Sequence, residues 1–308
     1  MIRRHALMKI AVPVILLGVT GIAVSVDLKN HDVKIVVADE SDLTRHIVDG
    51  LQRSFPSAQV SRSDKSDNVQ IPQKRKILYL AVGPSALRNL CSQGIEDPIV
   101  STFTSSQAYH SIMENGCSKR VGPTTAIFAD PAPENQLQLI SLLFKKQVPV
   151  IAILGPKSSY IEPILRRAAA KTKSSLSIGY VVDGQNLDSV LNKLGGAKAI
   201  LAIPDNTIYN AENIRDILVT TYRRNLAVVG FSANLVKAGA LASVKSGIDD
   251  IVPQLDEQLA DFDATGKIFD PQFPKYFSVI INEDVARSLN IIVDDGARKF
   301  GLSPKAKK

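Results

Sequence analysis

One stretch decides how the rest of the chain is interpreted: Ala199–Ala242 reads AILAIPDNTIYNAENIRDILVTTYRRNLAVVGFSANLVKAGALA. Its pattern predicts a strand, a polar loop, a helix, a second strand and a second polar loop, at 199–203, 204–206, 211–224, 227–231 and 232–234. Parallel strands of an open sheet bring their carboxyl ends to one rim, where ligands bind. We therefore expect Asp205, Asn206, Phe231 and Ser232 to line one edge of a ligand-binding cleft.

The same alternation continues through the chain in two consecutive runs. Apolar segments predict further parallel strands at 33–38, 77–82, 98–103 and 124–128, then at 148–154 and 176–182, and 57–61 is expected to be a short second strand. Helical patterns separate them, including one at Leu187–Leu194. Two runs of strand–helix units predict an α/β protein with two Rossmann-like doubly wound lobes.

The two lobes are expected to share the chain unevenly. We expect an N-terminal lobe of 32–124 plus about 243–274, a C-terminal lobe of 125–242 plus about 275–302, and a tail of 303–308. The crossings are expected near Thr124–Pro133, Ala242–Ile248 and Asp270–Tyr276. Pro253 is expected to kink or restart the helix at Ile248–Phe262, because an interior proline removes a backbone donor.

The order of these motifs resembles a known family. Asp205-Asn206-Thr207 after an apolar strand, and Gly239-Ala240-Leu241-Ala242 beyond the next strand, resemble the second lobe of TrpX-like substrate-binding proteins of ABC transporters. Those are type I periplasmic binding proteins, and the resemblance extends over roughly Asp32 to Ile292. It implies two lobes joined by a multi-strand hinge, a bound small molecule and a permease partner. The chain departs from the family at Thr104–Gln107, where relatives carry an Asp-Pro pair.

Composition and charge narrow the range of partners. The chain has 308 residues, of which 45% are hydrophobic, and a formal net charge of +7. That length accommodates two domains. The basic residues are scattered except for Lys74-Arg75-Lys76 and the Lys305–Lys308 tail, a pattern typical of solvated surface, so we expect no nucleic-acid partner.

The first residues have the pattern of an export signal. Arg3, Arg4 and Lys9 precede the uncharged run Ile10–Val26, and Ala23-Val24-Ser25 offers small residues for cleavage. A signal peptide over residues 1–25 is therefore expected, and an uncleaved membrane anchor is the alternative. Both place the folded body outside the cytoplasm, in the periplasm.

The only two cysteines are Cys91 and Cys117. In an oxidising compartment they either form a disulfide or remain two separate thiols, and the sequence leaves both open. Paired cysteines in the first lobe of some type I binding proteins favour the disulfide.

Strand-end loops supply the candidate ligand-binding residues. Six loops are expected to meet across the cleft: Asp39–Ser41, Gly83–Ala86, Thr104–Gln107, Gly155–Tyr160, Pro204–Thr207 and Phe231–Asn234. Their candidate residues are Ser41, Ser85, Thr104, Ser105, Tyr160, Asp205, Asn206, Phe231 and Ser232. Ser85 lies in Gly83-Pro84-Ser85-Ala86, which partly matches a ligand-holding turn of the family. Asp205 is expected either to hold an ammonium or hydroxyl group of the ligand or to cap the following turn.

No catalytic, metal-binding or cofactor-binding motif is present in the sequence. We therefore expect no enzyme activity and no cofactor. The expected function is that of an extracytoplasmic solute-binding protein, monomeric, which closes over an amino acid or similar small polar or aromatic ligand and delivers it to an ABC permease in the inner membrane. The alternative is a two-lobed envelope protein that binds a macromolecular partner without transport.

Overall fold

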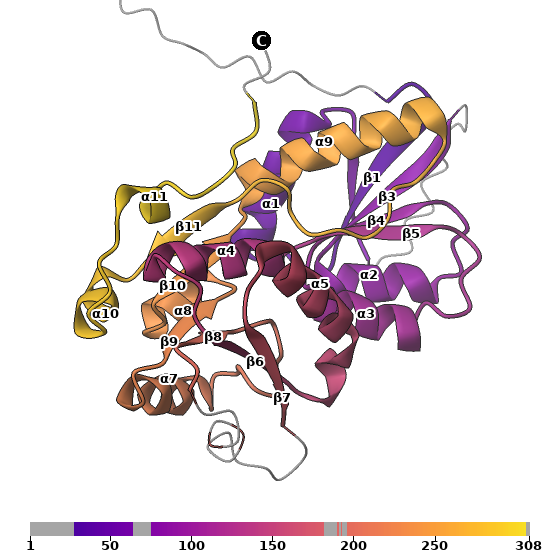
Figure 1. Ribbon diagram of the computed structural model, residues 1–308. Coiled ribbons are helices and arrows are strands. Elements are labelled where there is room, and N and C mark those ends of the chain that lie inside the picture. The colour runs from indigo at the N-terminus through magenta and orange to yellow at the C-terminus, as the bar shows by residue number, and fades with distance from the viewer. Residues whose placement is uncertain (1–27, 64–74, 182–189, 191, 193–195, 306–308) are drawn as a thin grey trace, which may run out of the picture.

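The chain folds into two α/β lobes, each built on its own sheet (Figure 1). The computed structural model describes residues 28–63, 75–181, 190, 192 and 196–305. The predicted signal segment lies outside the described residues, as do most of the helix expected at Leu187–Leu194 and the last residues of the tail. The two separate sheets confirm the predicted fold class.

The first lobe contains a parallel sheet in the order β2-β1-β3-β4-β5. Its strands are β1 (His31–Val37), β2 (Gln59–Arg62), β3 (Lys76–Val82), β4 (Ile99–Thr104) and β5 (Thr124–Phe128). Residues of β1, β3, β4 and β5 supply two cores, one on each face of the sheet. Leu78 and Leu80 pack beneath α1 (Asp42–Ser54) and α9 (Ile248–Thr265), and Ala81 packs beneath α2 (Gly83–Ser92) and α3 (Ser106–Asn115). Burial on both faces explains the continuous apolar runs of β1 and β3, whereas the edge strand β2 is partly exposed and polar.

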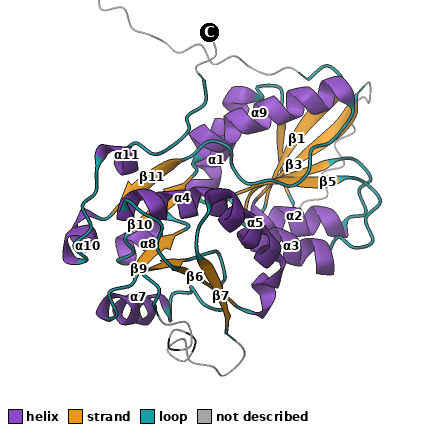
Figure 2. Ribbon diagram, in the orientation of Figure 1, coloured by secondary structure: helices purple, strands orange, loops and turns teal. Residues whose placement is uncertain are grey.

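The second lobe contains a six-stranded sheet in the order β11-β10-β9-β8-β6-β7, in which β11 alone is antiparallel to its neighbour among the described strands. Its strands are β6 (Val150–Leu154), β7 (Leu176–Tyr180), β8 (Ala199–Leu201), β9 (Ala227–Gly230), β10 (Ala242–Lys245) and β11 (Ser278–Ile281). Helices cover both faces (Figure 2): α4 (Pro133–Phe144), α5 (Glu162–Thr172), α10 (Glu283–Ser288) and α11 (Asp295–Arg298) on one, α7 (Ile214–Arg223) and α8 (Ala233–Ala238) on the other.

The chain changes lobes at the ends of strands. The expected boundaries at residues 125 and 243 fall inside β5 and β10, which are each hydrogen-bonded into one sheet along their length. A paired strand cannot be divided between sheets without losing those bonds. The crossings therefore follow Phe128 and Lys245, and the last one lies between Gln272, which bridges to Ile127, and β11.

Helix α9 belongs to the first lobe although it follows the second lobe in sequence. It packs against α1, where Gly50 allows close approach: a Cβ on Gly50 would meet Ile248 Cγ2 at 2.4 Å. The helix runs without interruption through Pro253, so it does not restart there. The carbonyl that Pro253 leaves without its helical donor belongs to Asp249, an exposed residue in the first turn, where water can replace the lost bond.

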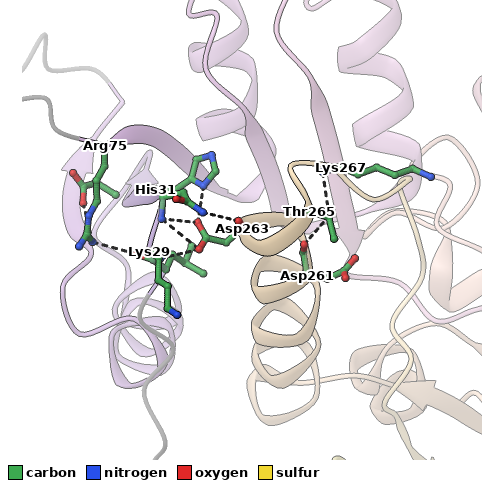
Figure 3. Close-up of polar contacts among 10 residues, drawn as sticks. Lys29, His31, Arg75, Asp261, Asp263, Thr265 and Lys267 are labelled. Carbon is green, nitrogen blue, oxygen red and sulfur yellow. Dashed lines mark hydrogen bonds and ion pairs between the residues drawn. The ribbon is translucent and has the colours of Figure 1, made fainter.

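Asp263, near the end of α9, fastens the beginning of the described chain (Figure 3). Its carboxylate accepts hydrogen bonds from Lys29 N (2.7 Å) and Asn30 N (3.0 Å) and contacts His31 Nδ1 at 2.8 Å. Burial alone would raise the pKa of Asp263, but these hydrogen bonds outweigh it, so the pKa lies below its ordinary value. The residue preceding them, Leu28, is buried in the first-lobe core.

A disulfide ties two helices of the first lobe together. Cys91, in α2, is bonded to Cys117, just after α3, and their Cα atoms are 5.0 Å apart. Both residues belong to the core beneath these helices. The structure thus selects the disulfide from the two possibilities that the sequence leaves open.

Candidate functional site

The two lobes contact each other through loops that follow β4, β6 and β8. Ser106 Oγ lies 2.8 Å from Tyr160 OH, and Gln107 Nε2 donates to Ser158 Oγ at 2.9 Å. Asn206 N donates to Gln107 Oε1 at 3.4 Å. Three strand-end segments expected to meet across the lobes therefore do so, through uncharged side chains and the backbone N of Asn206.

Each of the two contacting serines donates a hydrogen bond to a buried aspartate of its own lobe. In the first lobe, Ser106 donates from its backbone N and from its Oγ to Asp130, both at 2.6 Å. In the second lobe, Ser158 Oγ donates to Asp205 at 2.6 Å. Each serine donates its only hydroxyl proton to the aspartate of its own lobe. Its oxygen must therefore act as an acceptor across the lobe boundary: Ser106 accepts from Tyr160 OH, and Ser158 accepts from Gln107 Nε2.

Asp130 is the most perturbed acid of this cluster. It follows β5 at the first crossing and is 4% exposed. Burial raises its pKa to about 6, although the hydrogen bonds from Ser106 act in the opposite direction. The protonation state of Asp130 therefore depends on small changes in the surroundings of its carboxyl group at the lobe crossing.

Asp205 organises the loop on which it lies. Besides Ser158, its carboxylate accepts from Gly155 N at 2.9 Å, Thr207 N at 2.9 Å and Thr207 Oγ1 at 2.6 Å. Burial alone would raise its pKa, but these donors together lower it. All four donors come from its own lobe, and the residue is 1% exposed. This geometry fits the turn-capping alternative better than direct contact with a ligand ammonium group.

His110 extends the contact between the lobes. Its ring stacks on that of Tyr160, with centroids 4.2 Å apart. Burial lowers the pKa of His110, against the opposing charge of Glu114, and burial raises the pKa of Tyr160. Both rings are therefore uncharged at neutral pH, which suits packing against each other or against a planar ligand.

The other first-lobe candidates have positions that are either exposed or engaged within their own lobe. Ser41 and Ser85 are exposed: Ser41 caps α1 by accepting from Thr44 N, and Ser85 lies inside the first turn of α2. Thr104 is fully buried and accepts from Ser101 Oγ, and Ser105 caps α3 by accepting from Ala108 N. Phe103, at the end of β4, has a φ of 54° beside a register shift, a strained conformation of the kind found near functional sites.

Phe231 and Ser232 line a cavity within the second lobe. The cavity has a volume of about 200 Å³ and is bounded by the β8–α7 loop, the end of β9 and α8. The side chain of Asn206, by contrast, is exposed beside the lobe contact. The second-lobe candidates are thus divided between two places.

Five residues of this contact were not among the site residues expected from the sequence: Asp130, Ser106, Gln107, Ser158 and His110. Four of them lie in or next to loops already expected at the cleft. Asp130 follows an apolar strand, as the other candidates do, so the strand-end rule applied to β5 would have found it.

Neither a metal site nor a membrane-spanning helix is found within the described residues. Their His, Cys, Asp and Glu side chains form no group of three or more that could hold a metal ion. None of the helices in that part of the chain combines the length and apolar character needed to cross a membrane.

Comparison with known proteins identifies the fold. No protein-family model and no curated protein matches the chain. A ligand-free, open substrate-binding protein with adhesive properties from Clostridium difficile is 13% identical, with a TM-score of 0.60 over 90% of this chain and 100% of that one. An ABC domain from Streptococcus pneumoniae in complex with L-Trp is 14% identical, with a TM-score of 0.54 over 88% and 98% of the two chains. A conserved domain protein from Vibrio cholerae is 18% identical, with a TM-score of 0.53 over 88% and 98%. These similarities show the fold, that of a type I periplasmic binding protein.

Proposed function

We propose that this protein is an extracytoplasmic, non-enzymatic solute-binding protein that closes its lobes over a small ligand and delivers it to an ABC permease. The observation that carries the proposal is the pair of matched contacts between lobes, in which a buried aspartate fixes a serine that accepts from the opposite lobe. Pockets form preferentially at domain interfaces, and binding proteins of this fold work by hinge closure.

The groups at this contact indicate the kind of ligand. Ser106, Gln107, Tyr160 and Asn206 offer hydroxyl, amide and backbone groups, and the Tyr160 and His110 rings offer a stacking surface. We infer that a small polar or aromatic molecule, such as an amino acid, exchanges with some of these contacts. The L-Trp bound to the similar Streptococcus pneumoniae structure supports this class.

In this proposal Asp205 and Asp130 position the site and do not hold the ligand. Each is buried and already accepts hydrogen bonds from its own lobe. Exposed Ser41 and Ser85 remain proposed first-lobe contacts, because they lie at the carboxyl ends of β1 and β3.

A thermal-shift screen of the full chain against amino acids, small aromatic acids, nucleosides and sugars tests the proposal. A ligand at 100-fold excess over its Kd stabilises the folded state by about 2.7 kcal/mol, which raises the melting temperature by several degrees. Tyr160→Phe should weaken binding of the selected solute at least about tenfold, whereas the control Tyr222→Phe, on the exposed face of α7, should not. Equal affinities of the two variants would remove Tyr160 from the site.

A second candidate function is binding of a macromolecular partner in the envelope without transport. Direct hydrogen bonds between the lobes satisfy the central polar groups without a solute, which favours this alternative. It predicts that no solute shifts the melting temperature and that a defined envelope protein is recovered reproducibly by pull-down with the wild-type chain.

A further inference from the structure

The second lobe contains a cavity between α7 and α8 that the lobe contact does not use. It lies where the β8–α7 loop meets the end of β9, on the sheet face opposite α4. Tyr209 and Phe231 form one wall, with their rings edge to face and centroids 6.0 Å apart. Ile214, Leu235 and Ala238 contribute aliphatic surface.

Its size matches one ring rather than a large ligand. The volume is about 200 Å³. Pockets for drug-sized ligands measure roughly 300–1,000 Å³, and an apolar cavity of about 150 Å³ accommodates benzene. A single planar ring with a small substituent therefore fills this space.

The lining selects against charge. Among the described residues that border the cavity, none carries an ionised side chain at neutral pH. Burial is the main reason that the pKa of Tyr209 is raised, so its phenol remains neutral. The cavity opens to solvent past the exposed residues Ala211, Asn234 and Ala238, so a ligand charge would keep part of its hydration. On the side that faces the walls it would exchange water for uncharged groups, which is unfavourable.

Two polar groups remain available to orient a ligand. Ser232 Oγ accepts from Leu235 N as the cap of α8, which leaves its hydroxyl proton to donate. Asn234 is exposed at the cavity edge and offers both amide atoms. The Oδ1 atom of Asn210 already accepts from Glu212 N and Asn213 N, which caps the turn before α7. Asn210 therefore contributes surface to the cavity rather than an acceptor for the ligand.

The cavity is formed by the second lobe alone and is held in shape locally. Gly230 lets α8 approach the sheet: a Cβ on Gly230 would lie 2.9 Å from Leu235 Cδ1. Tyr209 N is also fixed by a 2.7 Å hydrogen bond to Asp205 O. Occupation of this cavity requires no movement of the first lobe.

We propose that this cavity is a binding site for a small uncharged molecule that consists of one planar ring with a hydroxyl or amine N–H group. The site is distinct from the contact between the lobes and does not depend on the proposed transport function. Ring faces pack on Phe231 and Leu235, and the polar group meets Ser232 or Asn234.

Saturation-transfer NMR titration of the full chain with four probes tests this inference. Phenol and indole should bind with a Kd on the order of 1 mM, as expected for fragments of this size. Benzoate and benzylammonium should bind at least about tenfold more weakly. Equal binding of charged and neutral probes, or no binding of phenol and indole up to about 10 mM, would overturn the proposal.

Substitutions that fill the cavity test where the probes bind, and an alanine-to-leucine substitution elsewhere is the matched control. Ala238→Leu and, from the opposite wall, Ala211→Leu should each weaken phenol and indole binding at least about tenfold, and both alanines are exposed, so either variant is expected to fold. Ala170→Leu, on the exposed side of α5, and Tyr160→Phe should leave probe binding unchanged. Loss of binding in Tyr160→Phe would place the probes at the lobe contact instead, and retained binding in both cavity-filling variants would also contradict the proposal.

Discussion

Replacing Asp130 with asparagine should remove a specific pH dependence of stability. Asp130 is fully buried at the first lobe crossing and has its pKa raised to about 6. Because this folded-state pKa exceeds the unfolded value of about 3.9, the carboxyl group stabilises the fold fully below pH 4. That stabilisation is lost as the pH rises through 6. Asparagine has nearly the same shape and does not titrate.

The expected size follows from the shift of about two pKa units, at about 1.4 kcal/mol each. Between pH 4 and pH 7, the free energy of unfolding of the wild type should fall by about 2–3 kcal/mol relative to the Asp130→Asn variant. Other titrating groups contribute equally to both proteins and cancel in this difference.

Chemical unfolding at pH 4, 5, 6 and 7 measures this difference. The two proteins should be compared at one denaturant concentration near their midpoints, because extrapolation to water adds error. A difference that stays constant from pH 4 to pH 7 would show that Asp130 has an ordinary pKa, and the burial argument would be wrong. A difference that grows in the opposite direction would show that hydrogen bonds from Ser106 outweigh burial.

Three further substitutions test other parts of the structure. Asp263→Asn should destabilise the protein by about 1–3 kcal/mol at pH 7 and speed amide exchange at Lys29. Because the pKa of Asp263 is lowered in the folded state, this destabilisation should fade as the pH falls through that pKa. Unchanged amide exchange at Lys29 would contradict the N-terminal contact. Asp205→Asn should lower the melting temperature of the ligand-free protein, at a cost of about 1–3 kcal/mol, whereas a stable variant that loses affinity for a solute would restore Asp205 as a ligand contact. Replacing both Cys91 and Cys117 with serine should cost about 2–4 kcal/mol in chemical unfolding, and no change under oxidising conditions would argue against the disulfide.

The fold was predictable because the central parallel strands are buried on both faces and therefore appear as apolar runs, as in β3 and β9. Details that depend on hydrogen bonding were less accessible. The helix expected from residue 211 begins at Ile214, because Asn210 Oδ1 caps a preceding turn. The expected lobe boundaries ignored the integrity of β5 and β10.

The site was predictable as a set of loops but not as a set of contacts. The strand-end rule places Thr104–Gln107 and Gly155–Tyr160 at the rim, and Ser106 and Tyr160 do meet there. It does not reveal that Asp205 is occupied by donors from Gly155 and Ser158, about fifty residues earlier in the chain. Whether a carboxylate is available to a ligand depends on such long-range partners, which the local sequence pattern does not encode.

The most direct test of the central claim is small-angle X-ray scattering of the full chain with and without the solute selected by the thermal-shift screen. Closure of two lobes over a ligand predicts a smaller radius of gyration when the solute is bound, and Tyr160→Phe should require more solute to reach the same value. A radius of gyration that does not change at saturating solute, or a screen in which no solute shifts the melting temperature, would contradict lobe closure over a small ligand.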